Sequence, residues 1–245
     1  MIENTFTDGI LEICINRPSK KNALSHEMYH ELERLFLEYG HLAACSAIVI
    51  YGAENSFTAG ADLNDFKTKR EPGDSPAVKF LRALCSSRAP VIAAVEGVAV
   101  GIGATLLQHC DFVYATSSVR FRMPFVTLGL GPEGASSYLL EKIVGRRKAR
   151  DWLITGRFFS GQEAHEAGFV TELVENGSTL ERAREIAKAL SELPINSVRT
   201  TKEMLGQWDY PQTHTAFNNE VKMFADQLAS PDTQSSIAST GKAGR

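Results

Sequence analysis

The amino-acid sequence predicts an α/β protein that ends in a helical region. Between residues 5 and 174, short apolar segments alternate with amphipathic segments, an order of strands and helices that is typical of an α/β core. From residue 178 onward the pattern is amphipathic and charged, which favours helices alone. No flexible linker separates the two parts, and we place the boundary near Pro194. The predicted core therefore spans residues 1–193 and the helical region spans residues 194–245.

The strands are predicted from short apolar segments bounded by turn residues. Residues 5–16 favour a hairpin, because Asp8 and Gly9 form a turn dipeptide and apolar and polar residues alternate after it. The uninterrupted apolar runs 47–50 and 91–95 are typical of strands buried on both faces. The remaining strand-like segments are 112–115, 119–122, 126–128 and 170–174.

The helices are predicted from apolar residues at helical spacing and from capping residues. Ser25 fits the N-cap of a helix whose apolar residues recur at i+4 and i+7 from Met28. Ser160 and Glu163 form a capping-box pattern, and Gly168 fits the end of that helix. Further helices are predicted after the glycine turn 97–103, after Gly134, over 146–155, and over 77–87, 178–191, 197–207, 213–229 and beyond residue 232.

Composition and charge exclude several classes of protein. The 26 basic and 29 acidic residues give a net charge of −3, which argues against nucleic-acid binding. Charge-free segments such as residues 97–110 are shorter than the ~20 residues of a membrane span. The first ten residues lack the basic and apolar run of a secretory signal. Four scattered cysteines without a C-x-x-C pattern favour a reducing compartment, and we expect a soluble, cytoplasmic protein.

One motif invites a metal-binding interpretation. The segment from His26 to His30 matches the H-E-x-x-H pattern of zinc proteases, in which both imidazoles must face a protected cleft. At 100° per residue, however, both histidines lie opposite the apolar residues Met28 and Leu32. We therefore predict that they point to solvent and that no metal binds there.

Three turns of small residues could carry chemistry. Ala59, Gly60 and Ala61 leave the backbone bare after a strand, so that an amide could approach a ligand, or they form a tight turn before a capping Asp62. The glycines from Gly97 to Gly103 offer amides around Ile102 at a helix N-terminus, or they serve packing alone. Glu133 either stabilises the start of a helix or acts as a general base in a dry pocket. These residues alone leave the alternatives open.

In combination, the motifs resemble the crotonase family, also called the enoyl-CoA hydratase/isomerase family, over nearly the whole chain. The resemblance rests on Asn16-Arg17-Pro18, Lys21-Asn22-Ala23-Leu24, the segments 57–63 and 90–101, Cys110-Asp111, and Ala164 with Gly168-Phe169-Val170. It implies a spiral of ββα units with C-terminal trimerising helices, and a homotrimer or a dimer of trimers. It also implies an acyl-CoA substrate, with coenzyme A as part of that substrate and no separate cofactor.

The resemblance assigns roles to individual residues. The amides of Ala61 and Ile102 would hold the thioester oxygen. The coenzyme A would lie along Lys21, Ala23, Ala59, Gly60, Ala61, Asp62 and Leu63. Hydratases of the family carry two glutamates, and their positions correspond here to Thr105 and Phe125. Glu133 instead matches the single acid of peroxisomal-type 3,2-enoyl-CoA isomerases.

The resemblance therefore implies an isomerase of β-oxidation that moves the double bond of 3-enoyl-CoA to give 2-trans-enoyl-CoA, with Glu133 as the acid/base. One alternative is a hydratase, or another acyl-CoA lyase or hydrolase, in which Glu133 acts on water. The other is a non-catalytic relative that binds RNA or another ligand, which the acidic charge balance disfavours. Candidate residues around the acyl chain are Phe66, Phe80, Leu84, Phe125 and Tyr138.

Overall fold

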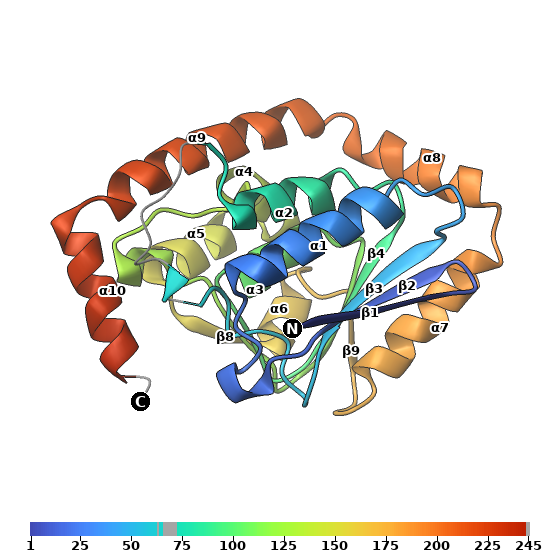
Figure 1. The fold of residues 1–245 in the computed structure, drawn as a ribbon, viewed down its shortest axis with the longest axis horizontal. Helices are drawn as coiled ribbons and strands as arrows, with labels where there is room; N and C mark the ends of the chain where they lie inside the picture. Colours follow the sequence, from blue (N-terminus) through green and yellow to red (C-terminus); the bar gives the residue numbers. More distant parts are fainter. Residues whose placement is uncertain (63, 66–72, 244–245) are drawn as a thin grey trace.

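Two sheets form the centre of the protein, whose computed structural model describes residues 1–62, 64–65 and 73–243 (Figure 1). The larger sheet has the order β1-β2-β3-β4-β6-β9, in which only β1 is antiparallel to its neighbour. Its strands are Ile2–Thr7, Ile10–Ile15, Ala47–Gly52, Val91–Val95, Phe112–Thr116 and Glu172–Val174. The smaller sheet joins β5 (Val98–Val100), β7 (Arg120–Arg122) and β8 (Phe158–Ser160).

The apolar runs of β3 and β4 are buried on both faces of the larger sheet, as predicted. Ile48 and Ala93 belong to the main core, under α1 (His26–Tyr39) and α2 (Pro76–Cys85). Val49 and Ile92 point the opposite way and pack under α7 (Thr179–Ser191). Because successive side chains of a strand alternate between its faces, a strand covered on both sides needs apolar residues at every position.

The remaining helices complete the layers. The shorter ones are α3 (Ile102–Thr105), α4 (Ser136–Val144), α5 (Arg146–Thr155) and α6 (Gly161–Glu166). The last three, α8 (Ile195–Gly206), α9 (Tyr210–Leu228) and α10 (Pro231–Ala243), run around the periphery as the orange-to-red arc of Figure 1. None of the helices in the described ranges combines the length and the apolar character needed to cross a membrane.

The predicted element order is confirmed, with three corrections. The strand β8 was not predicted, because its three residues form a strand only by pairing antiparallel with β7. Residues 98–100 lie within the predicted glycine turn but form β5, because they pair in parallel with β7. Residues 126–128 were expected as a strand but belong to the 3-10 helix η4 (Phe125–Leu128). Local bonds favour that helix, since the Thr127 hydroxyl and amide both donate to the Pro124 carbonyl, and Gly129 ends it with φ 76°. Three residues are too few for a sequence pattern to distinguish a strand from a turn at 98–100, or a strand from a 3-10 helix at 126–128.

The helix α1 begins as predicted. Ser25 accepts a hydrogen bond from the Met28 amide at 3.4 Å. Both histidines of the H-E-x-x-H pattern are exposed, and His30 lies 3.7 Å from Glu33 on the same face. The histidines therefore face away from the core, and no cluster of three potential metal ligands occurs among the described residues.

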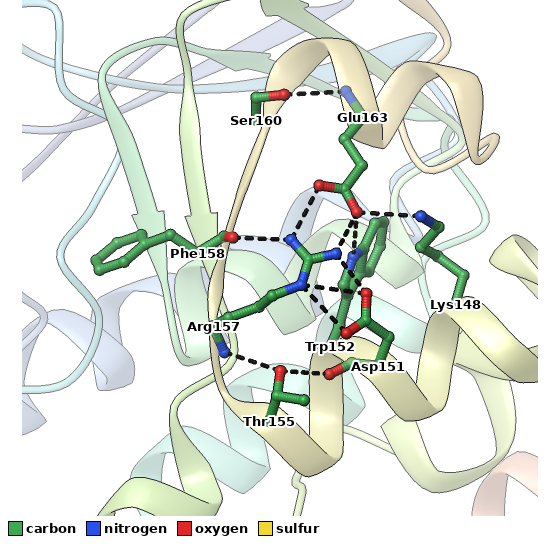
Figure 2. A network of polar contacts seen from close by, with 8 residues as sticks. All are labelled: Lys148, Asp151, Trp152, Thr155, Arg157, Phe158, Ser160 and Glu163. Atoms are coloured by element: carbon green, nitrogen blue, oxygen red, sulfur yellow. Dashed lines mark hydrogen bonds and ion pairs between the residues drawn. The ribbon is translucent and has the colours of Figure 1, made fainter.

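The predicted capping box at Ser160 is only half formed. Ser160 Oγ accepts from the Glu163 amide at 3.1 Å, but the Glu163 carboxylate accepts from Lys148, Trp152 and Arg157 (Figure 2). Arg157 also pairs with Asp151. This polar network, which we call the Arg157 network, joins α5, β8 and α6, and the stronger charge-assisted bonds explain why Glu163 does not return to the helix start.

Candidate active site

One cavity brings the three small-residue turns together. Its volume is about 410 Å³, which lies within the usual range for small-molecule sites. The turns contribute Ala59, Gly60, Ala61, Gly101, Ile102, Glu133 and Gly134 to its wall. Segments that are more than 70 residues apart in the sequence therefore meet around a single space.

A parallel bridge aligns the first two turns. Thr58 pairs with Ala99, since the Thr58 amide donates to Val98 and the Thr58 carbonyl accepts from Val100. Ala61 and Ile102 each lie three residues beyond this bridge on adjacent segments. Gly60 permits the close approach, because it adopts φ 93° and a Cβ there would lie 2.5 Å from the Val100 carbonyl oxygen.

The amides of Ala61 and Ile102 are available for a ligand. Leu24 bridges to Ala61 through the Gly60 carbonyl and the Asp62 amide, which leaves the Ala61 amide unused. Ile102 is the first residue of α3, where an N–H has no partner inside the helix. Neither amide finds an acceptor among the residues that the structure describes.

Glu133 has its carboxyl group at the wall of the cavity, among apolar neighbours. Phe125 and Leu130 line the same space, and the Thr105 hydroxyl donates to Glu133 Oε1. Removal from water disfavours the charged form, and burial raises the Glu133 pKa to about 8, although the Thr105 hydroxyl opposes the shift. Glu133 is half-buried and lines the cavity. Glu133 is thus a carboxyl group able to exchange a proton near neutral pH.

The residues expected along the coenzyme A divide into two groups. Ala59, Gly60 and Ala61 line the cavity, whereas Lys21, Ala23 and Asp62 lie beside it without lining it. The Lys21 carbonyl accepts a hydrogen bond from the Ala59 amide at 2.9 Å. The Arg17 guanidinium forms an ion pair with Asp62 at 2.8 Å and donates to the Ala23 carbonyl at 3.1 Å. Leu63 lies outside the described residues.

Of the described residues that we expected around the acyl chain, one lines the cavity and three do not. Phe125 lines the cavity, but Phe80 and Leu84 are in the main core and do not reach it. Tyr138 donates instead to Asp209 at 2.7 Å. None of these three side chains lines the cavity. The sequence does not separate them from pocket residues, because core and pocket residues share the same apolar periodicity. Phe66 lies outside the described residues.

The cavity residues that the sequence analysis missed include one from α1 and four from α9. Tyr29 of α1 is 2% exposed, and its hydroxyl finds no partner among the described residues. The helix α9 supplies Phe217, Glu220, Val221 and Phe224. A signal for Glu220 exists in the sequence, because it lies three residues after Phe217 and four before Phe224, on the apolar stripe of an amphipathic helix.

Comparison with known proteins gives a consistent family. The family model described as "Enoyl-CoA hydratase/isomerase" matches residues 5–242. Enoyl-CoA delta isomerase 2 of Homo sapiens is 33% identical over 95% of this chain and 61% of its own length. A probable enoyl-CoA hydratase of Rhizobium meliloti is 31% identical, over 92% of this chain and 89% of its own length. The chain therefore spans about three fifths of the human relative.

Solved structures agree with the sequence relatives. An enoyl-CoA hydratase/isomerase of Pseudoalteromonas atlantica is 35% identical, with a TM-score of 0.94 over 99% of this chain and 97% of that chain. The similarity covers both the sheets and the C-terminal helices. The expected crotonase-like fold is thereby confirmed.

Proposed function

This chain belongs to the enoyl-CoA hydratase/isomerase family, and from that premise we propose that it converts 3-enoyl-CoA into 2-trans-enoyl-CoA. The observation that carries the proposal is the position of Glu133, whose carboxyl group lines the same apolar cavity as Ala61 and Ile102, two residues whose amides have no acceptor among the described residues. The printed names of the similar proteins include both isomerases and hydratases, so that the choice between the two rests on the residues of the site.

The proposed reaction moves one proton. The Glu133 carboxylate removes a proton from C2 of the substrate, and the C2–H electrons form a C1–C2 double bond while negative charge develops on the thioester oxygen. The amides of Ala61 and Ile102 donate to that oxygen; removal of one such donor typically costs ~10²–10³-fold in rate. The protonated Glu133 then delivers its proton to C4: the charge on the oxygen re-forms the thioester carbonyl, the C1–C2 π electrons become the C2–C3 double bond, and the C3–C4 π electrons take up the proton. Glu133 is then a carboxylate again.

A single acid is sufficient for this transfer, whereas hydration needs a second group to hold and activate water. Thr105 and Phe125 occupy the two positions where the family resemblance expects the hydratase glutamates. Thr105 uses its hydroxyl to bind Glu133, and Phe125 adds an apolar wall. We also propose that Lys21, Ala23 and the 59–62 turn lie along the coenzyme A, since Ala59, Gly60 and Ala61 line the cavity and the Lys21 carbonyl binds the Ala59 amide beside it.

The test is the variant Glu133→Gln, which keeps size and shape but removes the base. We expect isomerisation of a 3-enoyl-CoA to fall by ~10²–10⁴-fold while the dissociation constant of a saturated acyl-CoA changes less than about threefold. Isomerisation is followed by the appearance of the conjugated enoyl absorbance. Wild-type turnover by this variant would refute the proposed role of Glu133.

Hydration is a second candidate activity because the Tyr29 hydroxyl lies in the same cavity and has no partner in the part of the chain that the structure describes. A hydroxyl in that position could hold a water molecule next to Glu133. Incubation with crotonyl-CoA separates the two activities, because a hydratase removes the conjugated absorbance and an isomerase leaves it unchanged. We expect no measurable loss.

We further propose a homotrimer or a dimer of trimers. The C-terminal helices and their connections expose large apolar side chains, with Leu205 and Trp208 each more than three quarters exposed. Exposed apolar residues in such a group favour contacts between copies. Sedimentation equilibrium should give three or six copies, and the double variant Leu205→Glu with Trp208→Glu should lower that number.

A further inference from the structure

One buried acid near the cavity has no part in the proton transfer. Glu220 belongs to α9, is 6% exposed and lines the cavity that contains Glu133. Buried carboxylates are costly unless hydrogen bonds compensate them. Its surroundings therefore indicate what it does.

Glu220 binds the backbone immediately after Glu133. One carboxylate oxygen accepts from the Ala135 amide at 2.6 Å and the other from the Ser137 amide at 2.7 Å. The helix α4 begins at Ser136, and its own N-cap residue, Ala135, provides no capping side chain. Glu220, which lies 85 residues after Ala135 in the sequence, therefore replaces the local cap with a carboxylate from α9.

The turn between Glu133 and α4 needs such support. Gly134 and Ala135 both have positive φ, at 73° and 59°, and the left-handed region is unfavourable for an alanine. Two further contacts restrain it, since His109 Nε2 lies 2.9 Å from the Gly134 carbonyl and Ser136 Oγ donates to the Glu133 carbonyl at 2.5 Å.

The helix α9 contributes to this support at three points. Phe217 stacks on the His109 ring at a centroid distance of 5.5 Å. Glu220 holds the two amides after the turn, and Gln227 accepts from the Gly131 amide at 2.7 Å before it. The segment that carries Glu133 is thus fixed on both sides by one helix.

We propose that Glu220 is a positioning residue for Glu133, because its carboxylate caps α4 from α9 and holds the left-handed turn that directs the Glu133 carboxyl group into the cavity. This inference rests on the proposed function, in which Glu133 is the acid/base. Glu220 itself does not touch the reacting atoms in this scheme. Its effect on catalysis is transmitted through the backbone of residues 134–137.

The charge of Glu220 adds a measurable signature. A second carboxylate in the cavity raises the pKa of Glu133, and burial raises the pKa of Glu220 itself to about 7. Among the residues that the structure describes, the other titratable or charged groups around the cavity are Tyr29 from α1, His109 beside α3 and Arg122 from β7. The pKa of His109 is held at about 4 by burial, so it is neutral at the pH of the assay. Removal of the Glu220 charge therefore lowers the pKa of Glu133.

The test compares Glu220→Gln with Asp226→Asn, an equal change of charge at an exposed position of the same helix. Glutamine keeps one acceptor but presents an NH₂ group to one of the two amides. We expect kcat for 3-enoyl-CoA isomerisation to fall by about 10- to 100-fold, because small displacements of a catalytic group have effects of this size. KM should change less than about threefold, and Asp226→Asn should match the wild type.

The pH profile separates positioning from a general loss of structure. The acid limb of kcat/KM, where Glu133 becomes ionised, should move to lower pH in Glu220→Gln. In Glu220→Asp the charge remains but the reach is shorter, so kcat should fall while the limb stays in place. This variant also serves as the test if Glu220→Gln does not fold.

Two results would overturn the inference. One is a wild-type kcat and pH profile in Glu220→Gln. The other is an equal loss at every pH that is accompanied by loss of acyl-CoA affinity, since that describes unfolding and not positioning. Failure of the proposed function is distinguishable, because it requires an active Glu133→Gln variant, whatever Glu220→Gln does.

Discussion

Two groups of carboxylates in this protein have opposite pKa shifts. In the Arg157 network, hydrogen bonds from Arg157 hold the pKa of Glu163 at about 2 and lower the pKa of Asp151. In the cavity, burial raises the pKa of Glu133 to about 8 and that of Glu220 to about 7. Both groups join segments of the core, and they differ in whether an arginine forms an ion pair with the carboxylates.

The difference separates a structural role from a chemical one. Each acid of the Arg157 network has an arginine partner, and no salt bridge within the described ranges involves Glu133 or Glu220. A paired carboxylate stays ionised and contributes to stability. An unpaired buried carboxyl group has a pKa near neutral pH, which allows Glu133 to take up and release a proton, whereas Glu220 acts through its position.

The largest predicted effect comes from the same substitution at the two sites. Glu133→Gln should lower isomerase kcat by ~10²–10⁴-fold without loss of stability. Glu163→Gln should leave kcat within about twofold and lower the free energy of unfolding by about 2 kcal/mol, since hydrogen bonds to a charged acceptor are lost. Initial rates and urea unfolding measure the two effects. Equal changes in kcat and in the free energy of unfolding for the two variants would contradict the proposed difference between the two sites.

Stability should depend on pH in opposite directions at the two sites. The folded pKa of Glu163 lies below its ordinary value of 4.5, so its contribution is present above pH 4.5 and is lost as the pH falls toward 2. The folded pKa of Glu133 lies above 4.5, so protonation stabilises the fold at low pH and this benefit is lost between pH 4.5 and about 8.

Urea midpoints between pH 3 and 8 check this prediction. The urea midpoint of Glu133→Gln should rise relative to that of the wild type as the pH rises from 4.5 to 8. The urea midpoint of Glu163→Gln should lie below that of the wild type near neutral pH, and this difference should become smaller as the pH falls. Parallel curves for all three proteins would contradict the opposite shifts.

A smaller effect is expected at Thr105. Thr105→Val removes the hydroxyl that favours ionised Glu133, and the pKa of Glu133 should therefore rise further. At pH 7 fewer molecules carry the base, and kcat/KM should fall up to about tenfold, with recovery above pH 9. Thr201→Val, at an exposed hydroxyl that binds Ser197, is the matched control. A loss independent of pH would exclude this explanation.

The smallest effect concerns two tyrosine hydroxyls. Tyr29→Phe removes a buried hydroxyl without a partner among the described residues and should raise the free energy of unfolding by about 1 kcal/mol. Tyr138→Phe removes a hydroxyl that binds Asp209 at 2.7 Å and should lower it by a similar amount. Chemical denaturation of both variants measures the contrast, and equal changes of the same sign would contradict it.

The sequence predicts well what depends on neighbouring residues. Ser25 caps α1 as expected, and the runs that became β3 and β4 are buried on both faces. The turns of Ala61, Ile102 and Glu133 were recognised by their small residues, but their roles came from the family resemblance. The parallel bridge from Thr58 to Ala99 explains why these turns meet, and such pairing leaves no local pattern.

What the sequence did not predict depends on distant contacts. β5 was assigned to a turn because its three residues need β7 as a partner. Glu220 was unremarked because its partners, Ala135 and Ser137, lie more than 80 residues away. Tyr29 falls at the edge of the apolar face of α1, where periodicity does not separate core from cavity. An acidic residue on the apolar stripe of an amphipathic helix, as at Glu220, indicates a buried carboxyl group that needs hydrogen-bond partners elsewhere in the fold.

The dependence of the cavity on α9 has a consequence for synthesis of the chain. The segment that bears Glu133 leaves the ribosome well before Tyr210–Leu228, and domains begin to fold during synthesis. Until α9 arrives, the cavity lacks one wall and the turn lacks its cap. A nascent chain should therefore form both sheets, whose last strand ends at Val174, while it is still unable to process acyl-CoA.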